Sequence, residues 1–169
     1  MDINSFKTAL GEGGARPNQF RVQITFPGDA ATAEQQLLVT GASLPASTVN
    51  PAIIQYRGRE VKLAGERIFD PWTITIVNDT SFTLRKKFES WMNAMNNRHD
   101  NTADLMEPGE YQREINVFHL DRNDKDLMAI QLEEAFPINM SEIALQYAQN
   151  DIIEEYTVTF QYQSYNVTA

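Results

Sequence analysis

The stretch Asp121-Arg-Asn-Asp-Lys-Asp126 places three carboxylates and one amide within six residues of this 169-residue sequence. Carboxylate and amide oxygens are the ligands that Ca²⁺ prefers, which invites comparison with a calcium-binding loop. The EF-hand pattern requires an acid or amide at its fifth position and glycine at its sixth. Lys125 and Asp126 occupy those two positions. We therefore predict a turn between two strands here, and no metal site.

The other residues that could do chemistry are two histidines and two carboxylate pairs. His99 and His119 have no second histidine at metal-ligand spacing, so we expect them to lie on a surface or to line a barrel. Glu133-Glu134 and Glu154-Glu155 are adjacent, and adjacent residues of a strand point to opposite faces. The sequence contains no Gly-rich phosphate loop, no Gly-x-Ser-x-Gly elbow and no cysteine. We predict no catalytic residue, no cofactor and no metal, and therefore no enzyme.

The charge balance limits the possible partners. The formal net charge is −9 at pH 7, and an acidic surface repels phosphate. Specific nucleic-acid binding is therefore not expected. The basic run Arg85-Lys86-Lys87 is most simply the solvated face of a helix, and contact with an acidic partner is the alternative. No apolar run is long enough to cross a bilayer and no secretion signal is evident, so we expect a soluble protein without a membrane partner.

A strand followed by a helix is the clearest structural unit. Residues 72–77 alternate, with Trp72, Ile74 and Ile76 on one face and Thr or Val on the other. A helix should follow and continue to about Asn97, with Asp79, Thr80 or Ser81 as its cap. Its apolar stripe recurs at spacings of three and four: Leu84, Phe88, Trp91, Met92 and Met95.

The rest of the chain predicts further strands in a single domain of residues 1–169. Residues 1–14 read as an arm with a short helix, ending in a glycine cluster. Residues 30–36 and 98–109 read as loops, and 136–143 as an irregular crossing or helical turn. The predicted fold class is mainly β, an antiparallel sandwich or barrel with one amphipathic helix. The expected strands are 20–26, 37–40, a hairpin over 53–63 with a turn at Arg57-Gly58, 115–120, 127–132 and 156–165.

Several of these segments resemble a known family. They are Ala15-Arg-Pro-Asn-Gln-Phe20, the block from Ala64 to Asp79, and Arg85-Lys-Lys-Phe-Glu-Ser-Trp91. Phe136-Pro-Ile-Asn139 and Ser141-Glu-Ile-Ala-Leu145 agree in the C-terminal half. Together they resemble the tail tube protein of contractile-tailed bacteriophages, a family related to the tube proteins of contractile injection systems. The resemblance covers nearly the whole chain from about Ala15.

The resemblance implies a structural subunit of the virion, assembled in the cytoplasm of the bacterial host. Six copies form a ring with a continuous inner β-barrel, and rings stack into a tube. The tube encloses the tape measure protein and later passes genomic DNA without specific binding. Its other partners are the tail sheath, the baseplate and the tail terminator. Alternatives are the inner tube of a tailocin or an extracellular contractile injection system, a baseplate adaptor, or a carbohydrate-active β domain.

The resemblance also assigns surfaces. The hairpin over Ile53–Leu63 is expected to reach a neighbouring subunit or ring. The helix is expected to face the sheath, with Arg85, Lys86 and Lys87 exposed. The lumen is expected to be polar and mainly acidic, although the sequence leaves open which strands line it. The expected hairpin contacts are Ile53, Tyr56, Arg57, Arg59, Glu60 and Lys62.

Overall fold

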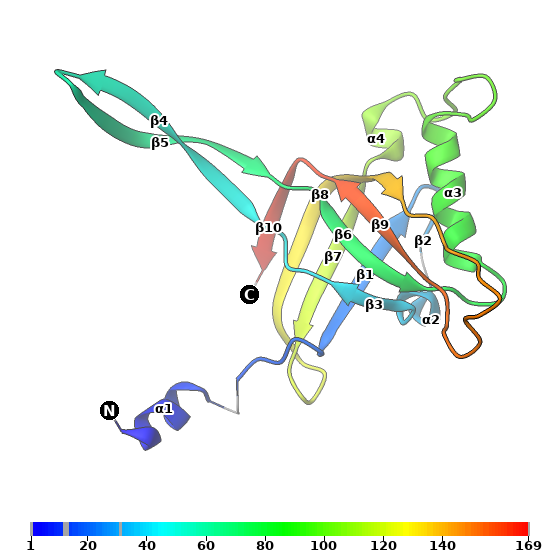
Figure 1. Cartoon of the computed structure of the whole chain (residues 1–169), viewed down its shortest axis with the longest axis horizontal. Helices are drawn as coiled ribbons and strands as arrows, with labels where there is room; N and C mark the ends of the chain where they lie inside the picture. Colours follow the sequence, from blue (N-terminus) through cyan, green and yellow to red (C-terminus); the bar gives the residue numbers. More distant parts are fainter. Residues whose placement is uncertain (1, 12–13, 31, 169) are drawn as a thin grey trace.

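A computed structural model describes residues 2–11, 14–30 and 32–168 (Figure 1). Its strands pair in the antiparallel sense, eight of them in one strongly curved, open sheet and two in a separate hairpin. The helices are α1 (Ile3–Ala9), α2 (Ala33–Gln36), α3 (Thr83–Met95) and α4 (Pro108–Tyr111). The strands are β1 (Phe20–Phe26), β2 (Asp29–Ala30), β3 (Val39–Ala42), β4 (Ser47–Tyr56), β5 (Arg59–Phe69), β6 (Trp72–Val77), β7 (Arg113–Leu120), β8 (Asp126–Met140), β9 (Glu155–Gln161) and β10 (Ser164–Thr168).

The long strand β8 joins two layers of the sheet. The strand order is β2-β1-β7-β8-β9-β6-β3, and β10 also pairs with β8. The first part of β8 lies between β7 and β10, and its last residues pair with β9. Glu134 has a positive φ of 54° where β8 passes from one layer to the other. We call the strands β1, β7, β10 and the first part of β8 the four-strand layer.

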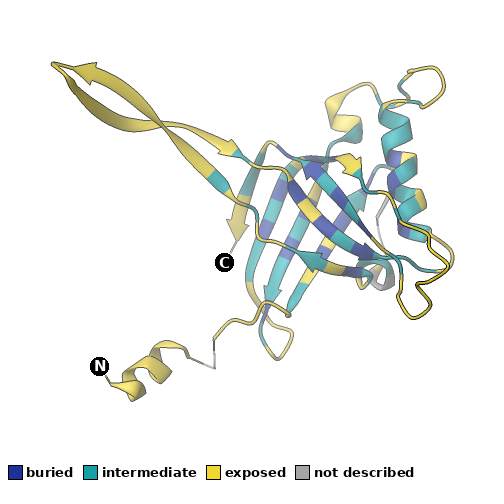
Figure 2. Ribbon diagram, in the orientation of Figure 1, coloured by how far each residue is buried: buried dark blue, intermediate teal, exposed yellow. Residues whose placement is uncertain are grey.

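Alternation within the strands builds one core between the layers (Figure 2). The buried residues of β1 are every second one, and β6 and β9 follow the same rule. For β6 this face was predicted from the sequence and is confirmed. The core side chains of the three strands are Val22, Ile24 and Phe26, then Trp72, Ile74 and Ile76, then Tyr156, Val158 and Phe160.

Helix α3 covers this core through aromatic side chains. Phe88 is fully buried, and its ring lies 4.9 Å from Phe26 of β1 and 5.8 Å from Phe160 of β9. Trp91 contacts the same two rings, with centroid distances of 5.6 and 6.4 Å. The predicted stripe of the helix is therefore confirmed at its centre. The contacts fix α3 against strands from both layers, because Phe26 and Phe160 belong to different layers.

Helix α3 begins at Thr83, and its start is stabilised from outside the helix. Phe82 stands at the N-cap with a positive φ of 54° and offers no side-chain cap. The side chain of Asp79 caps the helix instead. Its Oδ1 accepts a hydrogen bond from the Thr83 amide at 2.8 Å, and its Oδ2 accepts one from the Thr83 hydroxyl at 2.7 Å. Of the three predicted capping residues, Asp79 is the one with this role. These hydrogen bonds hold the pKa of the Asp79 carboxyl below its ordinary value.

Four expected segments differ from the structure in the first part of the chain and at its middle. The strand expected over 37–40 is β3, two residues later, and the expected loop 30–36 contains α2. The expected helix end at Asn97 lies two residues beyond Met95. Pro108 begins α4 instead of a simple turn, since proline suits the first turn of a helix.

Two C-terminal expectations were wrong. The irregular crossing expected over 136–143 is strand as far as Met140, because β8 continues to pair with β9, with a bulge between Pro137 and Asn139. The strand expected over 156–165 is two strands, β9 and β10, separated at Tyr162 and Gln163. Both strands pair with successive parts of β8, so the break bends the strand without changing its partner.

Asp79→Ala should lower the thermal midpoint at pH 7 by a few degrees, since it removes both hydrogen bonds to the first turn of α3. The pKa of Asp79 is lower in the folded protein than its ordinary value of 3.8. Its carboxylate therefore stabilises the folded protein fully above pH 3.8, and this stabilisation is lost as the pH falls through the pKa of the folded state. The difference between variant and wild type should therefore shrink in acid. Circular dichroism melts from pH 7 to pH 2 check this, with Thr80→Ala as the matched control. A difference that grows in acid would contradict the assignment.

Candidate subunit interfaces

Strands β4 and β5 form a hairpin that projects far from the sheet (Figures 1 and 2). It spans residues 47–69 and is longer than the expected 53–63. Its turn residues Arg57 and Gly58 have φ values of 48° and 81°. Two successive positive φ values match a type I′ turn, whose twist fits the two strands that it joins. The turn therefore lies where the sequence predicts it.

The outer half of the hairpin has one apolar face. Ile54 is opposite Val61, and Ala52 is opposite Leu63, with Tyr56 and Arg59 paired at the tip. Ile54 and Leu63 are 53% and 52% exposed. We call Ala52, Ile54, Tyr56, Val61 and Leu63 the apolar hairpin face. Branched and aromatic side chains that are about half exposed on a two-stranded ribbon are typical of a surface that another molecule covers.

The expected contact residues divide between the two faces of the hairpin. Tyr56 and Arg59 lie on the apolar hairpin face, and Arg57 holds its guanidinium 5.5 Å from the Tyr56 ring. Ile53 pairs with Lys62 on the opposite face, where Glu60 accepts a 3.2 Å hydrogen bond from Gln55. The contact residues expected from the sequence are mostly charged and do not include Ile54, Val61 and Leu63, which lie on the apolar hairpin face. Alternation counted from the Arg57-Gly58 turn would have found them.

A bulge in β5 twists the hairpin. Val49 pairs with Arg67 and Pro51 with Ala64, so Asn50 is opposite two residues, Gly65 and Glu66. A Cβ atom on Gly65 would lie 2.4 Å from the Asn50 carbonyl oxygen. The two backbones therefore approach more closely at Gly65 than any residue with a side chain allows.

Aromatic and polar contacts anchor the base of the hairpin to the break between β9 and β10. The Phe69 ring lies 5.8 Å from Tyr162 and 5.5 Å from Tyr165. The Tyr162 hydroxyl donates to the Ala46 carbonyl at 3.4 Å, and burial raises the pKa of Tyr162, which keeps it protonated as a donor. Trp72 donates its indole N–H to the Ser43 carbonyl at 2.6 Å. The hairpin is thus held at its base by the sheet's own core residues.

The outer face of the four-strand layer is polar. Gln23 of β1, Asn116 of β7, Gln131 of β8 and Asn166 of β10 are direct cross-strand neighbours and form one row of amides. We call this surface the amide face. Gln131 donates to Glu114 at 2.7 Å. The face therefore offers amides and carboxylates to whatever lies against it.

Charges on the amide face are acidic in balance. Glu133 accepts from both Ser164 and Asn166, which ties β8 to β10. The cation next to the amide row is Arg21, whose guanidinium is paired with Asp126 at 3.3 Å. A polyanion facing this surface would meet carboxylates and amides together with a neutralised arginine.

Both outer strands of the four-strand layer have open edges among the described residues. β10 pairs with β8 alone, and on the other side only Thr25 and Phe26 of β1 pair with β2. Residues 20–24 of β1 pair with β7 on one edge and with no described strand on the other. Such edges present unpaired backbone N–H and C=O groups, which readily accept a further strand.

The expectation that Arg85, Lys86 and Lys87 are all exposed on α3 is corrected by their burial. Lys86 is exposed, whereas Arg85 and Lys87 are half-buried. Arg85 lies 5.1 Å from the buried Tyr156 ring and 3.4 Å from the Glu89 carboxylate. Lys87 lies 5.5 Å from the Phe26 ring. The charged ends of both side chains lie over core aromatic rings, so a run of three basic residues does not mean three solvated charges.

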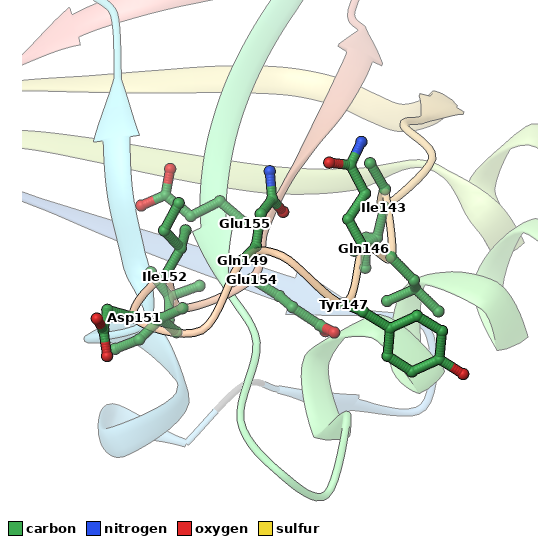
Figure 3. Close-up of a pocket in the computed structure, with 12 residues that line it drawn as sticks. Ile143, Gln146, Tyr147, Gln149, Asp151, Ile152, Glu154 and Glu155 are labelled. Carbon is green, nitrogen blue, oxygen red and sulfur yellow. The ribbon is translucent and has the colours of Figure 1, made fainter.

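The loop between β8 and β9, residues 141–154, forms a hollow of about 1040 Å³ (Figure 3). Val77 at the end of β6 lines one wall, and Ile152, Glu154 and Glu155 line another. We call this surface the loop hollow. Leu145 is 79% exposed there. Sequence reasoning assigned no role to the loop, although its apolar residues and its lack of Lys and Arg were visible signals.

Asp121, one of the carboxylates in the acidic stretch 121–126, has a structural role. Asp121 accepts from the backbone amides of Asn123 at 2.6 Å and Lys125 at 2.9 Å, which closes the turn between β7 and β8. Within the described ranges, no group of three metal-ligating side chains comes together. Across the same residues, no helix has the length and apolar character needed to cross a membrane.

Comparison with known proteins places the chain. A family model described as phage tail tube protein matches residues 15–168. Tail tube protein gp19 of Enterobacteria phage T4 is 31% identical over 146 residues, which cover 86% of this chain and 86% of that protein. The tail tube protein of Serratia phage KSP90 is 29% identical over 166 residues, covering 95% of this chain and 93% of that protein.

The fold agrees with that placement. A chain in the cryo-EM structure of the sheath/tube terminator of an extracellular contractile injection system (PVC, extended state) aligns with a TM-score of 0.69. Its identity is 13%, and the alignment covers 94% of this chain and 99% of that chain. The architecture is therefore the tube fold found in contractile systems. The chain itself belongs to the phage tail tube family, whose members are structural proteins, as the resemblance predicted.

Gly65→Val should distort the hairpin and leave the sheet folded, because the new side chain collides with the Asn50 carbonyl at the bulge. Protease sensitivity between residues 47 and 69 should rise, whereas the thermal midpoint of the core should change little. Limited proteolysis with mass spectrometry, combined with a thermal melt, measures both effects. Ala64→Val, one residue away and opposite Pro51, is the control. Equal proteolysis of the two variants would show that Gly65 is not required for the close approach.

Proposed function

We propose that this chain is the structural subunit of a contractile phage tail tube, in which six copies form a ring and rings stack. The observation that carries the proposal is the pair of open edges on the four-strand layer, β10 on one side and β1 on the other. The chain's membership in the tail tube family also supports the proposal.

The direction of the strands allows a ring to close. Successive strands β1, β7, β8 and β10 are all antiparallel. Because their number is even, β10 of one copy meets β1 of the next copy in the antiparallel sense. The two edges are different surfaces of the chain, so the contact is heterologous and closes into a ring when the rotation per copy fits. A closed ring turns the layers into one inner barrel without exposed edges.

The amide face is the surface that we assign to the lumen. It lies on the side of the four-strand layer away from the core, so closure of the barrel would turn it toward the axis. Amides and carboxylates without unpaired arginine on this row suit a wall past which DNA slides without specific binding. The same channel holds the tape measure protein before the genome passes.

Other partners belong to the outside and the ends of the tube. Helix α3, with Lys86 exposed, faces the tail sheath, and the hairpin contacts neighbouring subunits through Ile53, Tyr56, Arg57, Arg59, Glu60 and Lys62. The baseplate and the tail terminator meet the two ends, and assembly takes place in the host cytoplasm. The inner tube of a tailocin or an extracellular contractile injection system is the second candidate, since the fold aligns with a chain of such a system.

Replacement of residues 53–63 by a two-residue Asn-Gly turn should leave a folded protein that no longer forms tubes. The hairpin contributes nothing to the buried core beyond its base, since residues 53–63 are all exposed. Circular dichroism should show a retained thermal transition, and electron microscopy should show rings or monomers in place of filaments. Filaments of normal length from this variant would refute the role of the hairpin, and the wild-type chain is the control.

Labelling distinguishes the lumen from the outer wall, because the chain contains no cysteine. Gln131→Cys should react with a large polyethylene glycol maleimide in dissociated subunits and be protected in tubes. Lys86→Cys should react in both states, since Lys86 is exposed on α3 and assigned to the outer wall. A gel shift measures each reaction. Protection of the cysteine at 86 together with reaction of the cysteine at 131 would reverse the assignment.

A further inference from the structure

The hairpin and the loop hollow lie at opposite ends of the same pair of strands. β6 follows the hairpin directly and ends at Val77, which lines the loop hollow. β9 runs antiparallel beside it, from Glu155 at the loop hollow to Gln161 near the hairpin base. Figure 1 shows the hairpin and the loop on opposite sides of the sheet. The hairpin of one molecule therefore cannot reach its own loop hollow.

The two surfaces share an apolar character. The apolar hairpin face presents branched and aromatic side chains that are about half exposed, such as Ile54 and Leu63. The loop hollow presents Leu145, Ile152 and Ile153, which are 69–79% exposed. In Figure 3 the side chains of Ile152 and Ile143 come from opposite ends of the loop, so the apolar residues flank the hollow. Burial of both surfaces against each other would remove apolar area from water on each side.

Their charges are complementary. Residues 47–69 carry four basic side chains and two acidic ones, although the whole chain has a net charge of −9. Residues 141–155 carry four acidic side chains and no Lys, Arg or His. Arg59 lies on the apolar hairpin face itself, and Glu154 and Glu155 line the loop hollow. Opposite charges around matching apolar centres favour association and set its orientation.

We propose that the apolar hairpin face of one copy docks in the loop hollow of a second copy in the adjacent ring. The proposal rests on the tube function given above and specifies the receiving surface for the hairpin. Two different surfaces at opposite ends of the subunit make a heterologous contact, which repeats along an axis without closing on itself. Ring closure through β1 and β10 and stacking through the hairpin would then use separate parts of the molecule.

Paired cysteines test the contact in assembled tubes, since the chain has none of its own. The double variant Ile54→Cys with Ile153→Cys should form a ladder of covalent multimers when tubes are treated with a short bismaleimide. The matched control is Ile53→Cys with Ile153→Cys, because Ile53 is the neighbouring residue on the opposite face of the hairpin. A third variant, Phe6→Cys with Ile153→Cys, tests the exposed apolar side of α1 as a competing occupant.

We expect a ladder of covalent multimers from tubes of the variant with cysteines at 54 and 153. The control with cysteines at 53 and 153 should give much less of this product, and dissociated subunits should give no ladder. Electron microscopy of each sample first establishes that tubes are present. Three outcomes would overturn the docking proposal: intact tubes that give no ladder, equal ladders from the variants with cysteine at 53 and at 54, or a ladder from the variant with cysteine at 6. These outcomes leave the tube function standing, whereas a wild-type chain that forms no rings or tubes would refute the tube function itself.

Discussion

Among the described residues, backbone N–H and C=O groups at the two edges of the four-strand layer have no strand partner, and the rest of the structure depends on this constraint. Core residues of β1, β7 and β8, such as Val22, Val117 and Leu132, are buried on the inner face of this layer. β10 and the first residues of β1 remain the outer strands. A stable protein with such edges must either block them or supply a partner. Neither of these strands contains a lysine or a proline, two residues that commonly block edge strands.

Rigidity at the hairpin base decides whether an exposed arm can act as a connector. A flexible arm would lose conformational freedom on docking, and that loss lowers affinity. Here Phe69 lies against two tyrosines, and Tyr162 is itself part of the buried core. The bulge at Gly65 then fixes the twist halfway along the arm. The direction of the hairpin is consequently set by the same residues that hold β9 and β10 against the sheet.

Periodicity in the sequence predicts the elements whose two faces differ. The strands β1, β6 and β9 and the stripe of α3 could be located because one face of each is buried in the same core. The hairpin was predicted too short because the bulge at Gly65 shifts the alternation by one residue. The end of β8 was missed because Pro137 suggested a break. Past Ala135, β8 pairs with β9 on one edge and no longer with β7, so a proline is tolerated there.

Candidate surfaces were harder to predict than elements, for a physical reason. Lone basic residues were given contact roles, yet Arg85 and Lys87 lie over aromatic rings that only the tertiary fold brings near them. The loop hollow joins residues from the end of β6 and from a loop about 70 positions later, a proximity that no local pattern reveals.

Charge distribution links the two kinds of contact. Identical subunits with a net charge of −9 repel one another, and that repulsion opposes any ring or stack. The hairpin concentrates basic residues on a part of the chain that extends beyond the acidic body, so the proposed contacts with a neighbour would reduce the repulsion locally. The amide face keeps its acidic balance because Arg21 is already paired with Asp126. In the proposed tube, a single chain would therefore place attraction between subunits at the hairpin and weak attraction for polyanions at the amide face.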